Sequence, residues 1–149
     1  AASALFTASL KLEGRVSIQL RGESALRRVY AECQTDGNLR GIAHFDTPLP
    51  EQLPLSAFGP KAALAITIEN NSAGRREPQR YQGMVGLQAD TLSGAFEDYF
   101  TQSEQLPTRL LLFTQGNQAA GLLIQQLPEG KVRQMRHIDR HPQCADSLE

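Results

Sequence analysis

The 149-residue sequence contains no tryptophan and only two cysteines. Cys33 and Cys144 lie far apart and form no CxxC pair, which excludes a disulfide framework and favours a reducing compartment. No stretch approaches the roughly 20 consecutive apolar residues that cross a bilayer. The first residues also lack the basic region and long apolar core of a secretory signal. These absences predict a cytoplasmic protein that does not bind to or span a membrane.

An excess of charge of either sign is also missing. The chain has 15 Lys and Arg residues against 16 Asp and Glu, for a net charge of −1. There is therefore no overall positive field that would attract nucleic acid, so no nucleic-acid partner is expected. The net charge does not exclude a local basic patch. With 40% hydrophobic and 21% charged residues, a chain of this length predicts one globular domain with a sizeable core.

Helical spacing begins at the first residue, without an initiator methionine or a capping residue before it. We expect the rear part of a helix whose N-terminal segment is missing. The apolar positions of this helix are Ala1, Ala4, Leu5, Ala8 and Leu12.

The period then changes to two, because Val16, Ile18 and Leu20 alternate with polar residues as in a half-buried strand. Further strands are expected at residues 26–32, 39–45, 64–68, 81–87, 109–114 and 120–127. Asp36-Gly37 and Gly116-Asn117 are typical hairpin turns. The run from Leu110 to Phe113 has apolar residues in both phases, which predicts a strand pair near the centre of a sheet. The expected fold class is α+β, with mainly antiparallel sheets of about seven strands and a few packed helices.

Four prolines between Thr47 and Pro60 predict a loop with one helical turn. A second helix follows Asp90 or Thr91, either of which can cap it, and Pro107 helps to end it. One stripe of this helix comprises Leu92, Phe96, Tyr99, Phe100 and Ser103 and is largely apolar. The three aromatic residues are interpreted as core, with an exposed protein-binding stripe as the alternative.

The domain prediction is a core domain at residues 1–128 followed by a polar arm or linker remnant at residues 129–149. His137, His141 and Cys144 in this arm have the spacing H-x3-H-x2-C, and two imidazoles four residues apart on a helix can bind one zinc ion. Pro142 interrupts that helix and a fourth ligand is missing, unless Asp139 or a partner chain supplies it. A solvated tail is the preferred interpretation.

Other residues that could carry chemistry have simpler explanations. Glu97, Asp98 and Glu104 could act as acids or bases, but no opposed partner is visible and a solvated helix face is favoured. Ser24 lacks the second glycine of a nucleophile elbow and is interpreted as a turn residue.

Gly83 and Gly86 lack the rest of a dinucleotide-binding motif, and glycine in a strand usually permits a bulge or close packing. Cys33 is expected to be partly buried at a strand end, where ordinary packing is favoured over redox sensing. The sequence therefore indicates no catalytic, cofactor-binding or metal-binding residue. We expect a protein that is not an enzyme.

Four blocks resemble one known family in the same order along residues 2–128. They are VSIQLRG (residues 16–22), LRGIA (39–43), RYQGMVGLQADTLSGAFEDYFTQSEQLPTRLLL (80–112) and AAGLLIQQLP (119–128). Together they are similar to the N-terminal core of the redox-regulated 33-kilodalton heat-shock chaperone family.

This resemblance implies an ATP-independent holdase that binds unfolding proteins in the cytoplasm during oxidative and heat stress, as a homodimer. In the family a C-terminal module holds zinc through CxC and CxxC cysteines. Its oxidation to disulfides expels zinc and unfolds the module, because thiolates are both the zinc ligands and the targets of oxidants.

The sequence departs from the family where this switch would be, because it has neither CxC nor CxxC. We therefore expect no cofactor in this chain, with zinc in a module that the chain lacks. The alternative is a redox-insensitive binding or adaptor module on the same fold. A third hypothesis is a hydrolase that uses Ser24 or a metal at His137, His141 and Cys144.

Overall fold

The computed structural model describes residues 1–10, 13–24, 26–46, 48, 54–71 and 79–126. The fold is α+β, as predicted. Its elements in chain order are α1 (Ala2–Ser9), β1 (Gly14–Arg21), β2 (Leu26–Gln34), β3 (Leu39–Phe45), the 3-10 helix η1 (Leu55–Phe58), β4 (Ala63–Asn70), β5 (Gln79–Gly86), α2 (Leu92–Tyr99), the π-helical turn η2 (Phe100–Glu104), β6 (Thr108–Gln115) and β7 (Gln118–Gln125).

Five strands form one antiparallel sheet in the order β3-β2-β1-β4-β5, and β6 pairs with β7 in a separate two-stranded sheet. The expected hairpin turn joins β2 to β3, where Gly37 has φ 91° and Asp36 Oδ1 accepts from the Asn38 amide at 3.0 Å. After β3 the chain returns past the sheet so that β4 pairs with the free edge of β1. The predicted helical turn of the proline-rich segment is η1, which precedes β4.

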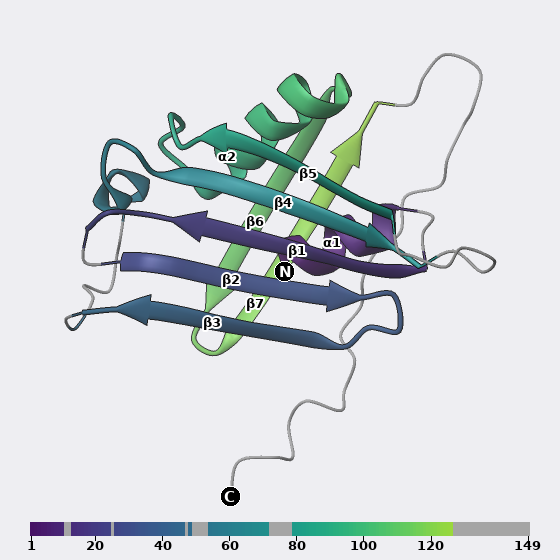
Figure 1. Ribbon diagram of the computed structural model, residues 1–149, viewed down its shortest axis with the longest axis horizontal. Coiled ribbons are helices and arrows are strands. Elements are labelled where there is room, and N and C mark those ends of the chain that lie inside the picture. Colours follow the sequence, from purple (N-terminus) through teal and green to yellow (C-terminus); the bar gives the residue numbers. More distant parts are fainter. Residues whose placement is uncertain (11–12, 25, 47, 49–53, 72–78, 127–149) are drawn as a thin grey trace, which may run out of the picture.

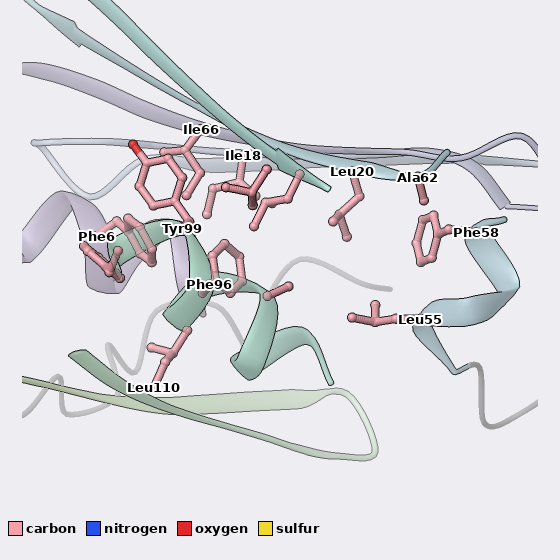
Figure 2. Close-up of a cluster of buried hydrophobic side chains, with 14 of the residues drawn as sticks. Phe6, Ile18, Leu20, Leu55, Phe58, Ala62, Ile66, Phe96, Tyr99 and Leu110 are labelled. Carbon is pink, nitrogen blue, oxygen red and sulfur yellow. The ribbon is translucent and has the colours of Figure 1, made fainter. Parts of the chain in front are cut away.

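The two helices lie between the two sheets and make a three-layer structure (Figure 1). Figure 2 shows the five-stranded sheet on one side of the helices and the β6–β7 hairpin on the other, with Leu110 of β6 pointing toward the helix layer. The inner face of the large sheet supplies Val16, Ile18 and Ile66 to the same core. The hairpin therefore reaches the large sheet chiefly through the helices.

Aromatic side chains fill the helix layer. The ring of Phe6 stacks on Phe100 with centroids 4.7 Å apart and lies 5.2 Å from Phe96, while Tyr99 meets Phe100 edge-on at 5.8 Å. Such pairs contribute about 0.5–1.5 kcal/mol each beyond the area they bury. Phe96, Tyr99 and Phe100 are core residues, as the sequence predicts.

The ends of α2 follow from local chemistry. Of the two possible caps, Thr91 is used, because its hydroxyl oxygen accepts from the Gly94 amide at 3.1 Å. The helix continues into η2 and ends at Gln105, which adopts a left-handed conformation with φ 53°. The chain thus leaves the helix just before the Leu106-Pro107 step.

The prediction that β6 and β7 lie centrally in a sheet is wrong. Among the strands that the structure describes, they pair with each other and with no third strand, and the side chains of Leu111 and Phe113 are 45% and 59% exposed. The apolar run in β6 places side chains on both faces of the hairpin, but the helix layer covers only one of these faces. The opposite face therefore leaves large apolar side chains uncovered.

The apolar stripe expected for α1 is correct only in part. Leu5 is buried, but Ala8 is exposed, while Ser3 and Thr7 are buried. The reason is that α1 is covered from two directions: Thr7 donates to the Cys33 carbonyl of β2 at 3.2 Å, and Leu5 packs against Gly121 of β7. Leu12 and the arm at residues 129–149 lie outside the described residues, so the domain boundary stays a prediction.

The close approach of β5 to α2 provides a test of this packing. A β-carbon added at Gly83 would lie 2.6 Å from Cε2 of Tyr99, whose side chain is buried. We expect Gly83→Ala to lower the free energy of unfolding by about 1–3 kcal/mol through overpacking, measured by urea denaturation. Gly86→Ala on the same strand is the control, since its nearest new contact is 3.5 Å away at a flexible glutamine side chain. Equal stability of the two variants would contradict the packing described here.

Candidate functional site

The carboxylates of α2 serve structural roles. Glu97 accepts from the backbone amide of Leu110 at 3.0 Å and from Arg109 Nη1 at 2.9 Å, so it fastens β6 to the helix. Glu104 accepts from the Tyr99 hydroxyl at 3.5 Å, and burial keeps the pKa of Tyr99 well above its ordinary value. The side chain of Asp98 makes no hydrogen bond or ion pair with another described residue. The structure therefore gives none of these groups an opposed catalytic partner among the residues it describes.

The remaining candidates are also accounted for by packing. Ser24 donates its hydroxyl hydrogen to the carbonyl of Ala57 and holds the turn after β1 against η1. Gly83 permits the close contact with the ring of Tyr99. Gly86, the last residue of β5, has space around it, since only the Gln88 side chain lies close to the position of an added β-carbon. Cys33 is a buried free thiol that donates to the carbonyl of Gln34 at 3.4 Å.

Metal binding finds no support in the described part of the chain. Within it, no group of three or more His, Cys, Asp or Glu residues could hold a metal ion. His137, Asp139, His141 and Cys144 lie outside the described residues. In the same described segments, no helix has both the length and the apolar character needed to cross a membrane.

The candidate site is instead the outer face of the five-stranded sheet. Val16, Ile18 and Leu20 of β1 point toward the helices, so the alternate residues of β1, and their partners in register on the other strands, point away from them. In Figure 1 this face is turned to the viewer, with the helices and the β6–β7 hairpin behind it. No described helix or strand covers the outer face.

A buried carboxylate organises the outer face. Glu32 of β2 is 1% exposed and accepts from the Tyr30 hydroxyl at 2.5 Å through Oε2. Its Oε1 lies 2.9 Å from Arg40 Nη2 of β3, and Arg15 Nη1 of β1 lies 3.6 Å from Oε2. The carboxylate thus ties together three neighbouring strands.

A second carboxylate extends these contacts across the sheet. Arg15 also pairs with Glu69 of β4 at 2.5 Å, and Arg80 Nε of β5 lies 3.8 Å from the same carboxylate. Because the pairs follow one another from strand to strand, all five strands are joined by this ion network on their outer side.

Burial alone would raise the pKa of Glu32. The hydrogen bond from Tyr30 and the nearby positive charges of Arg40 and Arg15 outweigh it, so the pKa of Glu32 lies below its ordinary value. The pKa of Tyr30 is raised, first by burial and then by its hydrogen bond to the Glu32 carboxylate. Glu32 is therefore held ionised as a structural anion.

The outer face is suited to binding. It carries five arginines against two glutamates on its strands, which are Arg15, Arg21, Arg28, Arg40 and Arg80 against Glu32 and Glu69. It also exposes two large apolar side chains, Ile42 at 55% and Met84 at 69%. Among its described residues no nucleophile is paired with a base, so this face can hold a ligand but shows no means of converting one.

The sequence interpretation did not single out this face. Its members are spread from β1 to β5, and only the strand register brings them together. The usable signal was the alternation in β1, where Arg15, Gln19 and Arg21 occupy the polar phase.

Replacement of Glu32 tests the ion network. We expect Glu32→Gln to lower the free energy of unfolding by about 1–3 kcal/mol at neutral pH, because charge-assisted hydrogen bonds are lost. Since the folded-state pKa is depressed, the stabilisation is present above the ordinary value of about 4.3 and disappears as the pH falls through the folded-state pKa. Urea denaturation at a series of pH values should therefore show the wild-type and variant curves converging in acid.

A difference in the free energy of unfolding between the wild type and Glu32→Gln that stays constant down to the lowest measurable pH would contradict this role for Glu32. Glu23→Gln is the control, because that carboxylate is 53% exposed and only 3.8 Å from Lys61. Its effect should stay within about 0.5 kcal/mol at every pH.

Glu97 offers a second test. We expect Glu97→Ala to lower the free energy of unfolding by about 1–3 kcal/mol, because the buried amide of Leu110 loses its acceptor. Glu97→Gln should lose less, since its side-chain carbonyl can still accept. Asp98→Ala serves as the neighbouring control in thermal or urea unfolding. A Glu97→Ala protein as stable as the Asp98→Ala protein would show that the carboxylate does not fasten β6.

Comparison with known proteins agrees with this architecture. A 33 kDa chaperonin of Shewanella sediminis is 41% identical over 128 residues, which cover 86% of this chain and 43% of that protein. A 33 kDa chaperonin of Shigella flexneri is 37% identical over 137 residues, covering 89% of this chain and 46% of the relative. The chain thus spans less than half the length of these curated relatives.

The crystal structure of a 33 kDa chaperonin (Hsp33) from Thermotoga maritima has a TM-score of 0.60 and 22% sequence identity, covering 80% of this chain and 43% of that one. This likeness supports the fold. The family model described as Hsp33 protein matches residues 1–149. Because that match extends over the entire sequence, the chain belongs to the Hsp33 protein family.

Proposed function

We propose that this chain is the core domain of an ATP-independent, redox-regulated holdase that binds unfolding proteins during oxidative and heat stress. The family and the name 33 kDa chaperonin of its relatives support a chaperone. The observation that carries the proposal is the exposure of large apolar side chains on the two edge strands of the large sheet and on the outer side of the β6–β7 hairpin.

These side chains are distributed over edge strands and over the hairpin. They include Leu39, Ile42, Phe45, Tyr81, Met84, Leu111, Phe113 and Ile124. A holdase needs broad apolar contact with non-native chains and no chemical step, since burial of apolar surface drives such association. The distribution supports weakly selective binding.

The redox part of the proposal concerns residues other than those described here. Cys33 is the only described cysteine, and its buried thiol has no neighbouring set of zinc ligands. The described residues therefore do not fit a zinc site, and we derive no step through zinc. The metal and the disulfide switch are proposed for a cysteine module elsewhere in the full-length protein.

We also propose a cytoplasmic homodimer as the working form. Support comes from the family resemblance and from the strand edges of β3, β5, β6 and β7, which pair with no further strand among the described residues and offer backbone groups for pairing. Unfolded or partly folded proteins are the proposed partners.

Light scattering of a thermally unfolding client tests the holdase. We expect the full-length protein to suppress aggregation without ATP, and more strongly after oxidation. Suppression should fall in Ile42→Ser/Met84→Ser, because two exposed apolar contacts are lost. Arg80→Ser is the control, as it changes an exposed polar side chain on the same face.

Two results would overturn parts of the proposal. Unaltered aggregation in the presence of both the oxidised and the reduced protein would exclude holdase activity. Equal suppression by the two forms would favour the redox-insensitive binding module instead. A full reading frame with four downstream cysteines in CxC and CxxC spacing would exclude that alternative.

A further inference from the structure

Three basic side chains lie side by side at one end of the outer face. Arg21 of β1 is directly opposite Arg28 of β2, and Arg28 is directly opposite His44 of β3. All three are exposed. We call these residues the basic row.

The carboxylates nearest to this end of the sheet are engaged by other cations. Asp46, just beyond β3, accepts from Arg27 Nε at 2.7 Å. Glu23, just beyond β1, lies 3.8 Å from Lys61. Glu32, farther along β2, is held within the ion network. These carboxylates therefore leave the basic row uncompensated.

The basic row itself has almost no internal partners. Arg21 Nη2 donates to the side-chain oxygen of Gln19 at 3.1 Å. Within the described part of the chain, the side chains of Arg28 and His44 form no hydrogen bond or ion pair. Like charges directly opposite each other on neighbouring strands destabilise a sheet. The arrangement of Arg21 and Arg28 is thus unfavourable for the isolated fold and favourable for binding an anion.

A second row lies two residues farther along the strands. Ile42 of β3 pairs with Tyr30 of β2. Met84 of β5 occupies the same level on the far side of the sheet, separated from Tyr30 by Gln19 of β1 and Ala65 of β4, so it offers a separate apolar contact. Rows two residues apart are separated by about 6.6 Å, which is also the spacing of alternate side chains in an extended polypeptide. An extended segment lying along the strands can therefore place a carboxylate over Arg28 and an apolar side chain over Tyr30 and Ile42.

We propose that the outer face selects acidic, extended segments of non-native polypeptide: the basic row binds their carboxylates, and the row of Ile42, Tyr30 and Met84 takes their apolar side chains. This inference rests on the proposed holdase function and adds a preference among its clients. Charge complementarity then supplies selectivity and faster encounter, while apolar contact supplies most of the affinity.

A polypeptide suits this face better than a single-stranded nucleic acid does. Nucleic-acid platforms stack successive bases on several aromatic rings. In the described strands the outer face has one tyrosine, Tyr30, whose hydroxyl is committed to Glu32, and one imidazole, His44, but no phenylalanine. Ile42 and Met84 are aliphatic and match apolar side chains.

Fluorescence anisotropy with the full-length oxidised protein tests the inference. The probes are a short labelled peptide of Asp and Leu with Ser spacers, its counterpart with Lys in place of Asp, and a labelled oligothymidylate. We expect the acidic peptide to bind more tightly than the basic one, with an affinity that falls as salt is added. Arg21→Gln/Arg28→Gln should weaken binding of the acidic peptide about 5- to 30-fold, since two charge pairs are lost.

Arg80→Gln is the matched control, because it removes an arginine of the same face outside both rows and should change this affinity less than about twofold. The urea midpoint of the double variant should equal or exceed that of the wild type, since the repulsion between two facing positive charges is removed. This measurement excludes unfolding as the cause of weaker binding.

Several outcomes would overturn the inference. They are equal affinity for the acidic and basic peptides, undiminished binding by the double variant, and tighter, arginine-dependent binding of the oligothymidylate. If the protein suppresses client aggregation but shows no preference for the acidic peptide, the holdase proposal stands and this inference is wrong. A protein that does not suppress aggregation would instead exclude the holdase.

Discussion

The structure depends on the aromatic contacts between its two sheets. Phe6 of α1 and the rings of α2 and η2 interlock in one layer, and each sheet packs on that layer from its own side. A two-stranded hairpin is marginally stable by itself. The β6–β7 hairpin is therefore stable because it buries Leu110 and its neighbours against helices that the large sheet already holds in place.

In this arrangement the hydrophobic core packs on the inner face of the large sheet and not on its outer face. The inner face supplies the aliphatic core, so the outer face can carry charge and exposed apolar side chains with little effect on packing. Glu32 is the exception, because it is almost fully buried there and is stabilised by Tyr30 and two arginines. One face of the sheet thus makes the fold and the other is available to partners.

The strands, the Asp36-Gly37 turn and the start of α2 could be predicted from the sequence, because alternation, turn residues and capping residues act locally. The choice of Thr91 over Asp90 as the cap came from the structure. The position of the β6–β7 hairpin could not, since an apolar run such as residues 110–113 looks the same whether one face or both faces are covered. The outer face was also missed. Arg21, Arg28 and His44 become neighbours only through strand register, and the balanced net charge of the chain conceals their grouping.

The position of α1 between the sheets has a consequence for folding during synthesis. The five strands of the large sheet are complete once β5 ends at Gly86, but Leu5 meets its contact at Gly121 only after β7 has been made. The side of α1 that faces β2 can pack early, but the side that carries Leu5 is covered only when β7 arrives. Until then part of the apolar surface of α1 is uncovered, and the growing chain resembles the kind of client that it is proposed to protect.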